Sequence, residues 1–355
     1  MTGGGEPAAP GQGSRTLRGT LLLAATRLVA ALPEAPLVAA AESIGELWYR
    51  LAPTRAAQAR ANLRRVCEGL DAQGRGTRLA RRAATDPDAL ELLVRRCFRH
   101  TVRYYLEVAR IGSVDLQQAL DRVVVETPDT VRETLHSGRP VVVLGMHFGG
   151  IELPAIVVAH LVGHRVSGPM ETVADPAIQR WFETTRGRVG VTIVPVQNAR
   201  RTLLAALRRG ESVGLVNDRD ISGSGIPVPF FGSPAPMSPG PALLALETGT
   251  PVCVAAARRI SAGRYAGKVI AVPLPVEGTR RERMVVLTAA IAAAYETILA
   301  DAPEQWWGAF HPIWPDLVVG AGSGDGVEHG ARTGGGVRTG TGRTPPASHE
   351  PETIP

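Results

Sequence analysis

The sequence predicts an α/β fold with a mostly parallel central sheet, covered by helices on both faces and preceded by a helical region. Short runs rich in valine and isoleucine recur from about residue 121 and alternate with helical stretches. This alternation is typical of parallel strands that are buried on both faces. In the first 110 residues, apolar side chains instead recur at spacings of three and four residues. At 355 residues and 44% hydrophobic content, the chain is long and apolar enough to bury a sizeable core.

The helical region is expected over residues 16–110. Its apolar residues follow helical spacing at Ile44, Leu47, Trp48 and Leu51, and again within residues 90–98. The longest apolar run, residues 20–32, contains Arg27 and is shorter than the roughly 20 residues that span a bilayer. We therefore expect no transmembrane helix, although this run suits a membrane interface.

The predicted core, residues 121–318, is divided by its composition into strands and helices. Strands are expected at residues 123–125, 141–144, 193–196, 213–216, 252–255 and 269–272. Helices are expected at residues 129–135, 152–162, 176–186, 200–208, 239–247 and 282–300. Residues 1–15 and 319–355 are rich in glycine, proline and polar residues, so both are predicted to be disordered tails around one folded domain, residues 16–318.

The basic excess of the chain is confined to its first hundred residues. The net charge is +6, and residues 1–100 alone hold 15 arginines against 9 acidic residues, a net of +6. Nine arginines lie between Arg50 and Arg82, against Glu68 and Asp71. Such a region favours a phosphate-rich partner, either a nucleic acid or an anionic membrane surface. Three cysteines without metal-ligand spacing predict neither a disulfide framework nor a zinc site.

A histidine follows one of the predicted strands. Residues 141–144 lead into Gly145, Met146, His147, Phe148, Gly149, Gly150, Ile151 and Glu152. In open parallel sheets, ligands bind at the carboxyl ends of strands. An imidazole there can accept a hydroxyl proton, and the backbone N–H groups of residues 148–151 are candidate donors to an oxyanion. The glycines allow a tight turn and close approach of a substrate. The alternative is a histidine that caps a helix, followed by a surface glutamate.

A second predicted strand end carries further charged residues. Residues 213–216 run into Asn217, Asp218, Arg219 and Asp220, which places carboxylates near the edge where His147 lies. A carboxylate there can fix the imidazole tautomer, as in a catalytic triad. The alternative is a solvated loop.

Two aromatic segments are also candidate binding elements. Phe230 and Phe231, in a glycine- and proline-rich loop, are expected to be partly exposed and to line an acyl or lipid groove, with core anchoring as the alternative. The tryptophans of residues 306–314 favour core anchoring over a binding role. The chain lacks the Gly-x-Ser-x-Gly of serine hydrolases and the Gly-x-Gly-x-x-Gly of dinucleotide sites.

Five segments together carry a resemblance to a known family. They are His147 with Glu152, residues 217–220 (NDRD), 228–232 (VPFFG), 237–246 (MSPGPALLAL) and 303–306 (PEQW). Over residues 18–317 this ordered set resembles the lipid A biosynthesis acyltransferase family, most closely its actinobacterial branch that acylates phosphatidylinositol mannosides. The resemblance implies an α/β enzyme that moves a fatty acyl group, palmitoyl in the first instance, from acyl-CoA to a mannose hydroxyl, without a cofactor or metal.

The resemblance also implies roles for particular residues. His147 is expected to be the general base, Asp218 its supporting carboxylate, and Glu152 the acidic member of the His-x4-Glu motif. Because the branch usually has a longer glutamate where this chain has Asp218, the division of labour among Asp218, Asp220 and Glu152 stays open. The implied substrate-binding residues are Phe148, Gly149, Gly150, Arg186, Arg188, Arg219, Asp220, Phe230, Phe231 and Gly232.

The expected partners are acyl-CoA, a phosphoinositide glycolipid acceptor and the anionic cytoplasmic face of the cell membrane, which the basic helical region would contact. Another glycolipid or a lysophospholipid is an alternative acceptor. A non-catalytic lipid-binding protein is a further alternative, which the presence of both His147 and Glu152 disfavours. A nucleic acid is not expected as a partner, since the basic region lacks interleaved aromatic residues and a recognisable binding module.

Overall fold

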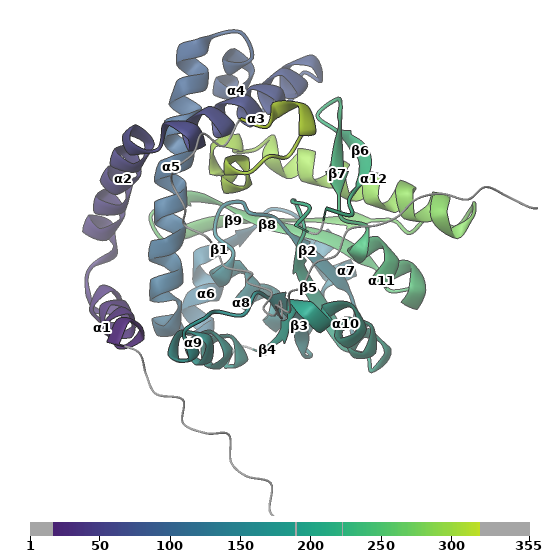
Figure 1. Ribbon diagram of the computed structural model, residues 1–355. Coiled ribbons are helices and arrows are strands. Elements are labelled where there is room, and N and C mark those ends of the chain that lie inside the picture. Colours follow the sequence, from purple (N-terminus) through teal and green to yellow (C-terminus); the bar gives the residue numbers. More distant parts are fainter. Residues whose placement is uncertain (1–16, 189, 222, 320–355) are drawn as a thin grey trace, which may run out of the picture. The chain divides into compact units, whose positions relative to one another are not determined.

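The computed structural model describes residues 17–188, 190–221 and 223–319 (Figure 1). The tails predicted at residues 1–15 and 319–355 lie outside the described residues, apart from Val319. The described chain has the predicted mixed α/β architecture, with a seven-stranded central sheet and a separate two-stranded hairpin.

The central sheet has the strand order β1-β9-β8-β2-β5-β3-β4. Five of its six strand pairs are parallel, and β8 with β9 forms the one antiparallel pair. The strands of this sheet are β1 (Val123–Val125), β2 (Val142–Gly145), β3 (Val166–Met170), β4 (Val191–Pro195), β5 (Ser212–Val216), β8 (Val252–Ser261) and β9 (Arg264–Val272). The hairpin consists of β6 (Ile226–Phe230) and β7 (Ser233–Met237). The sheet is therefore mostly parallel, as predicted.

Helices precede the sheet and connect its strands. The α-helices are α1 (Leu17–Ala31), α2 (Glu34–Leu51), α3 (Pro53–Ala72), α4 (Arg78–Ala83), α5 (Pro87–Arg110), α6 (Leu116–Arg122), α7 (Pro128–Thr134), α8 (Glu152–Val162), α9 (Pro176–Gly187), α10 (Ala199–Arg208), α11 (Gly240–Thr248) and α12 (Arg280–Leu299). Short 3-10 helices are η1 (Ile111–Ser113), η2 (Val196–Asn198), η3 (Pro303–Gln305), η4 (Trp307–Phe310) and η5 (Pro315–Leu317).

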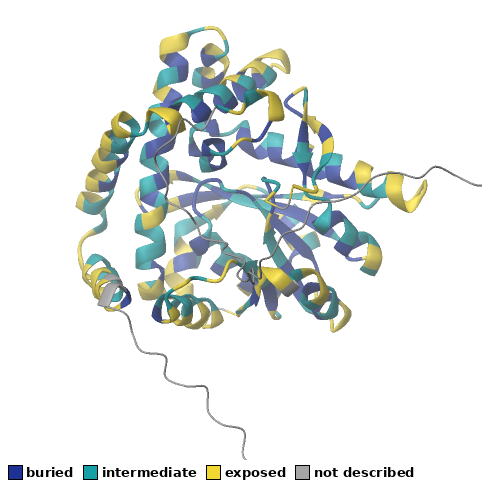
Figure 2. Cartoon of the chain, in the orientation of Figure 1, coloured by how far each residue is buried: buried dark blue, intermediate teal, exposed yellow. Residues whose placement is uncertain are grey.

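Strand β2 shows how the sheet is covered on both faces. Val142 and Leu144 join the larger hydrophobic cluster, with residues of α5, α10, α11 and α12. Val141 and Val143 point the other way and pack with residues of α7 and α8. Successive side chains of a strand face opposite sides of its sheet, so a continuous apolar run is what a doubly covered strand requires. Figure 2 shows the sheet as mostly buried, with helices above and below it.

The N-terminal helices form a layer in which α2 packs along α5. A Cβ on Gly45 would lie 2.6 Å from the Cα of Arg99, so glycine is needed where the two backbones meet. The apolar periodicity of residues 90–98 faces the core as predicted, because Leu90, Leu93 and Phe98 are buried. Trp48 of α2 packs edge-on against Phe98 at 4.9 Å between ring centroids.

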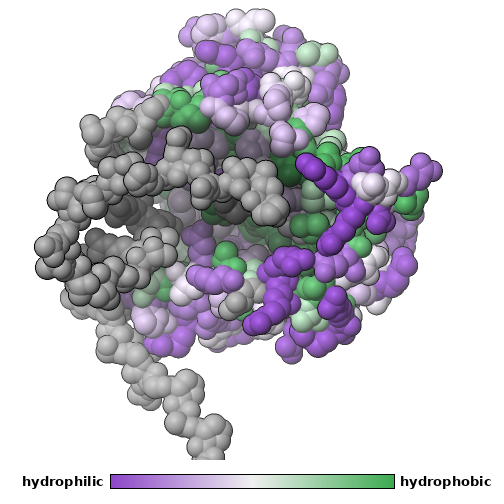
Figure 3. Space-filling view, turned by 45° about the vertical axis from the view of Figure 1, so that its right-hand side comes forward, coloured by the Kyte–Doolittle hydropathy of each residue, from purple (hydrophilic) through white to green (hydrophobic). Residues whose placement is uncertain are grey.

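The outer face of this layer exposes large apolar side chains. Ile44, Leu47 and Leu51 of α2 are 56%, 55% and 68% exposed, and Leu21 and Leu28 of α1 are 61% and 65% exposed. Figure 2 shows exposed residues in yellow along both helices. Figure 3 brings the right-hand side of Figure 1 forward, and on that side hydrophobic residues gather between more hydrophilic upper and lower parts. None of the helices in the described chain has the length and apolar content needed to cross a bilayer.

Two features of the structure differ from the sequence prediction. Strand β3 was missed because its five residues, VSGPM, contain no run of β-branched residues. The β6–β7 hairpin was missed because both strands are rich in proline. Its prolines face one another as the pairs Pro227–Pro236 and Pro229–Pro234. The residue pairs that alternate with them keep their N–H groups and can form the hydrogen bonds between the two strands.

The predicted partial exposure of Phe230 and Phe231 is wrong. Phe230 is 0% and Phe231 3% exposed, so the hairpin tip is anchored in the core. Phe231 has a left-handed backbone with φ of 48°, which is uncommon for a bulky residue. A Cβ on Gly69 of α3 would lie 2.8 Å from the Cβ of Phe231, which shows how closely the two segments pack. The burial of both rings removes the reason for assigning them, with Gly232, to an acyl groove.

Candidate active site

His147 and Asp218 meet at the carboxyl edge of the sheet. Strands β2 and β5 are parallel neighbours, so the segments that follow Gly145 and Val216 emerge side by side. His147 lies two residues beyond β2, and Asp218 lies two residues beyond β5. The expectation that the two segments share one edge is confirmed by this topology.

The contact between the two side chains is close and buried. His147 Nδ1 lies 2.5 Å from Asp218 Oδ1, and Asp218 is 0% exposed. Trp306 Nε1 donates to the other carboxylate oxygen at 2.8 Å. A carboxylate only accepts, so Nδ1 carries the proton and Nε2 of the neutral ring keeps its lone pair. Burial alone would raise the pKa of Asp218, but His147 and these hydrogen bonds outweigh it and hold the pKa below its usual value.

The segment of residues 303–310 closes over this pair. Gly308 N donates to His147 O at 3.2 Å, and a Cβ on Gly308 would lie 2.7 Å from Asp218 Oδ2. Trp306 is fully buried, whereas the Trp307 ring packs edge-on against the His147 ring, with centroids 4.5 Å apart. Tyr104 of α5 stacks on Trp307 at 4.5 Å. The His147 ring therefore lies between the buried carboxylate of Asp218 and the aromatic ring of Trp307.

Three of the four backbone N–H groups predicted for the oxyanion site, those of residues 148–150, already donate hydrogen bonds within the protein. Phe148 N donates to Met146 O at 2.8 Å, Gly149 N to Gln305 O at 3.0 Å and Gly150 N to Ala257 O at 3.3 Å. Phe148 itself is buried. The three N–H groups are therefore already used, and an oxyanion would have to displace a protein carbonyl to reach them.

The glycine pair serves chain packing instead of the predicted close approach of a substrate. Gly149 has φ of 54°, and a Cβ there would lie 2.0 Å from Ala257 O of β8. A Cβ on Gly150 would lie 2.7 Å from the Tyr265 ring of β9. Arg259 of β8, also buried, donates to Gly149 O at 2.9 Å and pairs with Glu107. The loop is thus seated against β8 and β9.

Glu152 is bound by an arginine, and no contact joins it to His147. It is the first residue of α8, is 7% exposed, and accepts two hydrogen bonds from Arg186 of α9, from Nε at 3.1 Å and from Nη2 at 2.5 Å. Arg186 Nη1 also lies 3.0 Å from Met170 Sδ. Glu152 and Arg186, both predicted site residues, therefore form one partly buried ion pair with each other. Arg188, one residue beyond α9, is exposed.

Of the three carboxylates left open by the sequence, Asp218 is the one placed against the histidine. Asp220 Oδ2 accepts from Gly225 N at 2.6 Å and so supports the loop that leads to the hairpin. Arg219, between the two aspartates, is half-buried, and its Nη2 lies 3.4 Å from His147 Nε2. Asp218 and Arg219 thus face opposite nitrogens of the same ring.

Comparison with known proteins identifies the family of the chain. The model of the bacterial lipid A biosynthesis acyltransferase family matches residues 14–315. The chain belongs to this family.

Curated relatives add a more specific likeness. The phosphatidylinositol mannoside acyltransferase of Mycolicibacterium smegmatis is 28% identical over 180 residues, which cover 48% of this chain and 58% of that protein. The phosphatidylinositol mannoside acyltransferase of Mycobacterium tuberculosis H37Rv is 29% identical over 154 residues, covering 41% of this chain and 48% of that protein. The chain spans about half the length of the curated relatives it matches.

Among the described residues, other nucleophiles and metal ligands are not gathered into a site. Burial raises the pKa of Cys67 and of Cys253 to about 12, so neither thiol ionises near neutral pH. In the part of the chain that the structure describes, no cluster of three histidine, cysteine or acidic residues is arranged to hold a metal ion.

Two residues around His147 carried no signal in the sequence analysis. Tyr104 and Arg259 reach the site from α5 and β8, and nothing in their local sequence marks them. Trp307 lies in the tryptophan segment expected to anchor the core, yet its ring packs against His147. Gln305 belongs to the segment PEQW that carries part of the resemblance. Its side chain bonds the backbone of Arg259 in both directions, at 2.8 Å and 2.9 Å, which ties η3 to β8.

Proposed function

We propose that this acyltransferase moves a fatty acyl group, palmitoyl in the first instance, from acyl-CoA to a mannose hydroxyl of a phosphatidylinositol mannoside. The observation that carries the chemistry is His147, held by buried Asp218 with Nε2 left as the acceptor. The names of the mycobacterial relatives support the acceptor. The proposed acyl donor is a thioester, which supplies a good leaving group without a metal or cofactor.

The proposed role of His147 is that of general base. Nε2 takes the proton of the mannose hydroxyl as its oxygen attacks the thioester carbonyl, and Asp218 stabilises the imidazolium that forms. A positioned base contributes about 10²–10⁴-fold to such a step. The proposed role of Glu152, by contrast, is to position the site through Arg186, since their ion pair joins the first turn of α8 to α9.

The test is acyl transfer by the purified full chain, with palmitoyl-CoA and mannosylated phosphatidylinositol. His147→Ala is expected to lower kcat by at least about 10²-fold. His160→Ala on the exposed side of α8 is the matched control and should leave kcat unchanged. Wild-type transfer at full rate by His147→Ala would refute the general-base role. Transfer to another glycolipid or to a lysophospholipid, but not to the mannoside, would refute the acceptor.

We also propose that the outer face of α1 and α2 contacts an anionic membrane, where this acceptor would reside. The exposed residues Ile44, Leu47 and Leu51 provide an apolar surface. The adjoining α3 and α4 supply positive charge, because five of the nine arginines between residues 50 and 82 have no ion pair within the described residues: Arg55, Arg64, Arg75, Arg78 and Arg81. Apolar insertion and charge attraction together bind an interfacial helix.

Vesicle sedimentation tests this membrane contact. The full chain should bind vesicles in which about a third of the lipid is phosphatidylinositol. It should not bind vesicles of phosphatidylcholine alone. A variant with Ile44→Ser and Leu47→Ser should bind about tenfold more weakly, while Val276→Ser, exposed far from this layer in the sequence, is the control. Equal binding by the double variant would exclude this face.

A further inference from the structure

Arg219 is a cation at the site that lacks a partner carboxylate. Within the described ranges, no carboxylate oxygen lies within ion-pairing distance of its guanidinium, and its Nε is buried without a hydrogen-bond partner. Its Nη2 lies 3.4 Å from His147 Nε2. Arg186 and Arg259, the other two arginines near the loop, are paired with Glu152 and Glu107. Arg219 is thus the arginine of the three whose charge is left for a substrate.

The contact with His147 defines what Arg219 faces. An arginine side chain only donates hydrogen bonds and stays protonated, so Nε2 opposite it must be the acceptor nitrogen of the ring. This is the tautomer that Asp218 also imposes from the other side. An acceptor hydroxyl that binds to Nε2 must therefore enter beside the guanidinium, and the carbon it attacks lies next to both.

A second unpartnered donor flanks the same ring. Trp307 packs edge-on against His147, and its Nε1 is buried with no hydrogen-bond partner among the described residues. Buried N–H groups are nearly always satisfied, so two orphan donors on side chains that flank one imidazole ring indicate a missing acceptor atom. The backbone donors of residues 148–150 cannot serve it, because each is bonded to a protein carbonyl.

Resting on the proposed function, we infer that the side chains of Arg219 and Trp307 form the oxyanion site of the transfer reaction. The hydroxyl proton passes to His147 Nε2 while the hydroxyl oxygen bonds to the thioester carbon. The carbonyl π electrons move to its oxygen, which accepts from Arg219 and Trp307. When the C=O bond re-forms, the C–S bond breaks, and the thiolate takes the proton from Nε2. The products are the ester and the free thiol.

Steady-state kinetics can distinguish an oxyanion-binding role of Arg219 and Trp307 from simple substrate binding. A donor that acts on the developing oxyanion lowers kcat when it is removed, whereas one that binds substrate and transition state equally changes KM alone. Removing one oxyanion donor costs about 10²–10³-fold in kcat, so this loss is expected for Arg219→Gln. Trp307→Phe keeps the ring and removes only the N–H, and should lower kcat by about fivefold to tenfold.

The closing experiment measures kcat and KM for both substrates in the full chain. Arg219→Ala should regain turnover when guanidinium ion is added and not when urea is added, which a purely structural role would not produce. Arg201→Gln, on the exposed side of α10, is the control for loss of one surface charge. A wild-type chain without transfer would refute the proposed function itself. Wild-type transfer with an unchanged kcat in Arg219→Gln, or with a change in KM alone, would overturn this inference and leave the function standing.

Discussion

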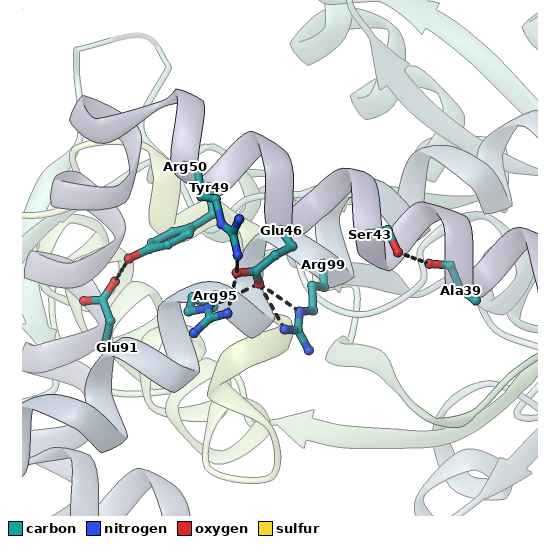
Figure 4. A network of polar contacts seen from close by, with 8 residues as sticks. All are labelled: Ala39, Ser43, Glu46, Tyr49, Arg50, Glu91, Arg95 and Arg99. Atoms are coloured by element: carbon teal, nitrogen blue, oxygen red, sulfur yellow. Dashed lines mark hydrogen bonds and ion pairs between the residues drawn. The ribbon is translucent and has the colours of Figure 1, made fainter.

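Two arginine-rich regions of this protein differ in how their arginines are paired. In the α2–α5 layer, Glu46 accepts from Arg95 and Arg99 and also pairs with Arg50, and Glu91 accepts from Tyr49 (Figure 4). Glu91 also pairs with Arg60 of α3. At the carboxyl edge of the sheet, Arg219 has no carboxylate within ion-pairing distance among the described residues.

The difference shows that a count of arginines in a stretch of sequence overstates the charge that is left free for an anion. The excess of arginine in the first hundred residues suggested a phosphate-rich partner, yet some of it, such as Arg60 and Arg65, is neutralised by Glu91 and Asp316, which are distant in the sequence. The carboxyl edge of the sheet lies in a part of the chain with balanced charge, yet Arg219 there has no ion pair among the described residues. Pairing in the fold, more than the count of arginines, determines where an anion can bind.

The largest effect is expected at the carboxylate that holds His147. Asp218→Asn keeps the size of the side chain but favours the wrong imidazole tautomer, and should lower kcat by about 10³–10⁴-fold. The measurement is the rate of acyl transfer at saturating substrate. A loss under Asp218→Asn no larger than under Asp220→Asn would contradict the assignment of the supporting role to Asp218.

The same variant has a defined effect on stability at acid pH. The pKa of Asp218 is lowered in the folded chain, so its contribution to folding is present above the unfolded value of about 4 and is lost as pH falls below it. Urea unfolding should be measured between about pH 3 and pH 6, a range around the unfolded pKa of about 4. As the pH falls, the free energy of unfolding should decrease less for Asp218→Asn than for the wild type. Parallel declines would contradict the lowered pKa.

A smaller but still large effect is expected from the buried pair of α8 and α9. Glu152→Gln leaves Arg186 largely buried without its countercharge, and breaking such a pair costs about 3–5 kcal/mol of folding free energy. Replacing both residues, as Glu152→Gln with Arg186→Met, should recover most of this loss. Urea unfolding at pH 7 measures both. A double variant as unstable as the single one would show that Arg186 serves more than this pair.

The network of Figure 4 should respond much more weakly to the same change. Glu46→Gln removes a carboxylate whose partners Arg50, Arg95 and Arg99 are all partly or largely exposed, so a loss of about 1 kcal/mol is expected at low salt, and less at high salt. Unfolding at two salt concentrations measures it. A loss as large as that of Glu152→Gln would erase the contrast between the two regions.

The fold and part of the site follow from local sequence. Continuous apolar runs such as residues 141–144 mark strands buried on both faces, and the residues just after parallel strands must share an edge, which places His147 with Asp218. The pairing of Glu152 with Arg186 could not be predicted, because the two residues lie 34 positions apart and no local pattern reveals it. Strand β3 lacks a run of β-branched residues, and the prolines of the hairpin strands break the pattern on which strand prediction depends.

What the sequence could not supply is the part of the site made by tertiary contact. Whether the N–H groups of Gly149 and Gly150 are free depends on Gln305 and Ala257, which approach from η3 and β8. Whether Arg219 is paired depends on every carboxylate that the fold brings near it. Both facts concern absences and neighbours in space, so motif spacing carries no information about them.

The smallest expected effect tests the unpaired charge of Arg219 directly. Burial, followed by the charges of Arg219, His147 and Arg55, lowers the pKa of His311 to about 4. Because the folded pKa lies below the unfolded value of about 6.5, the contribution of His311 to stability is present above that value and is lost as pH falls toward 4.

If Arg219 carries an uncompensated charge, Arg219→Gln should raise the pKa of His311, by an amount that corresponds to about 1 kcal/mol or less for partly screened charges. Histidine NMR titration measures it, with the His311 signal assigned from the spectrum of His311→Gln. Arg201→Gln is again the surface control and should leave this pKa in place. An unchanged pKa in Arg219→Gln would mean that a countercharge already neutralises Arg219, and the contrast with the paired arginines of the α2–α5 layer would then fail.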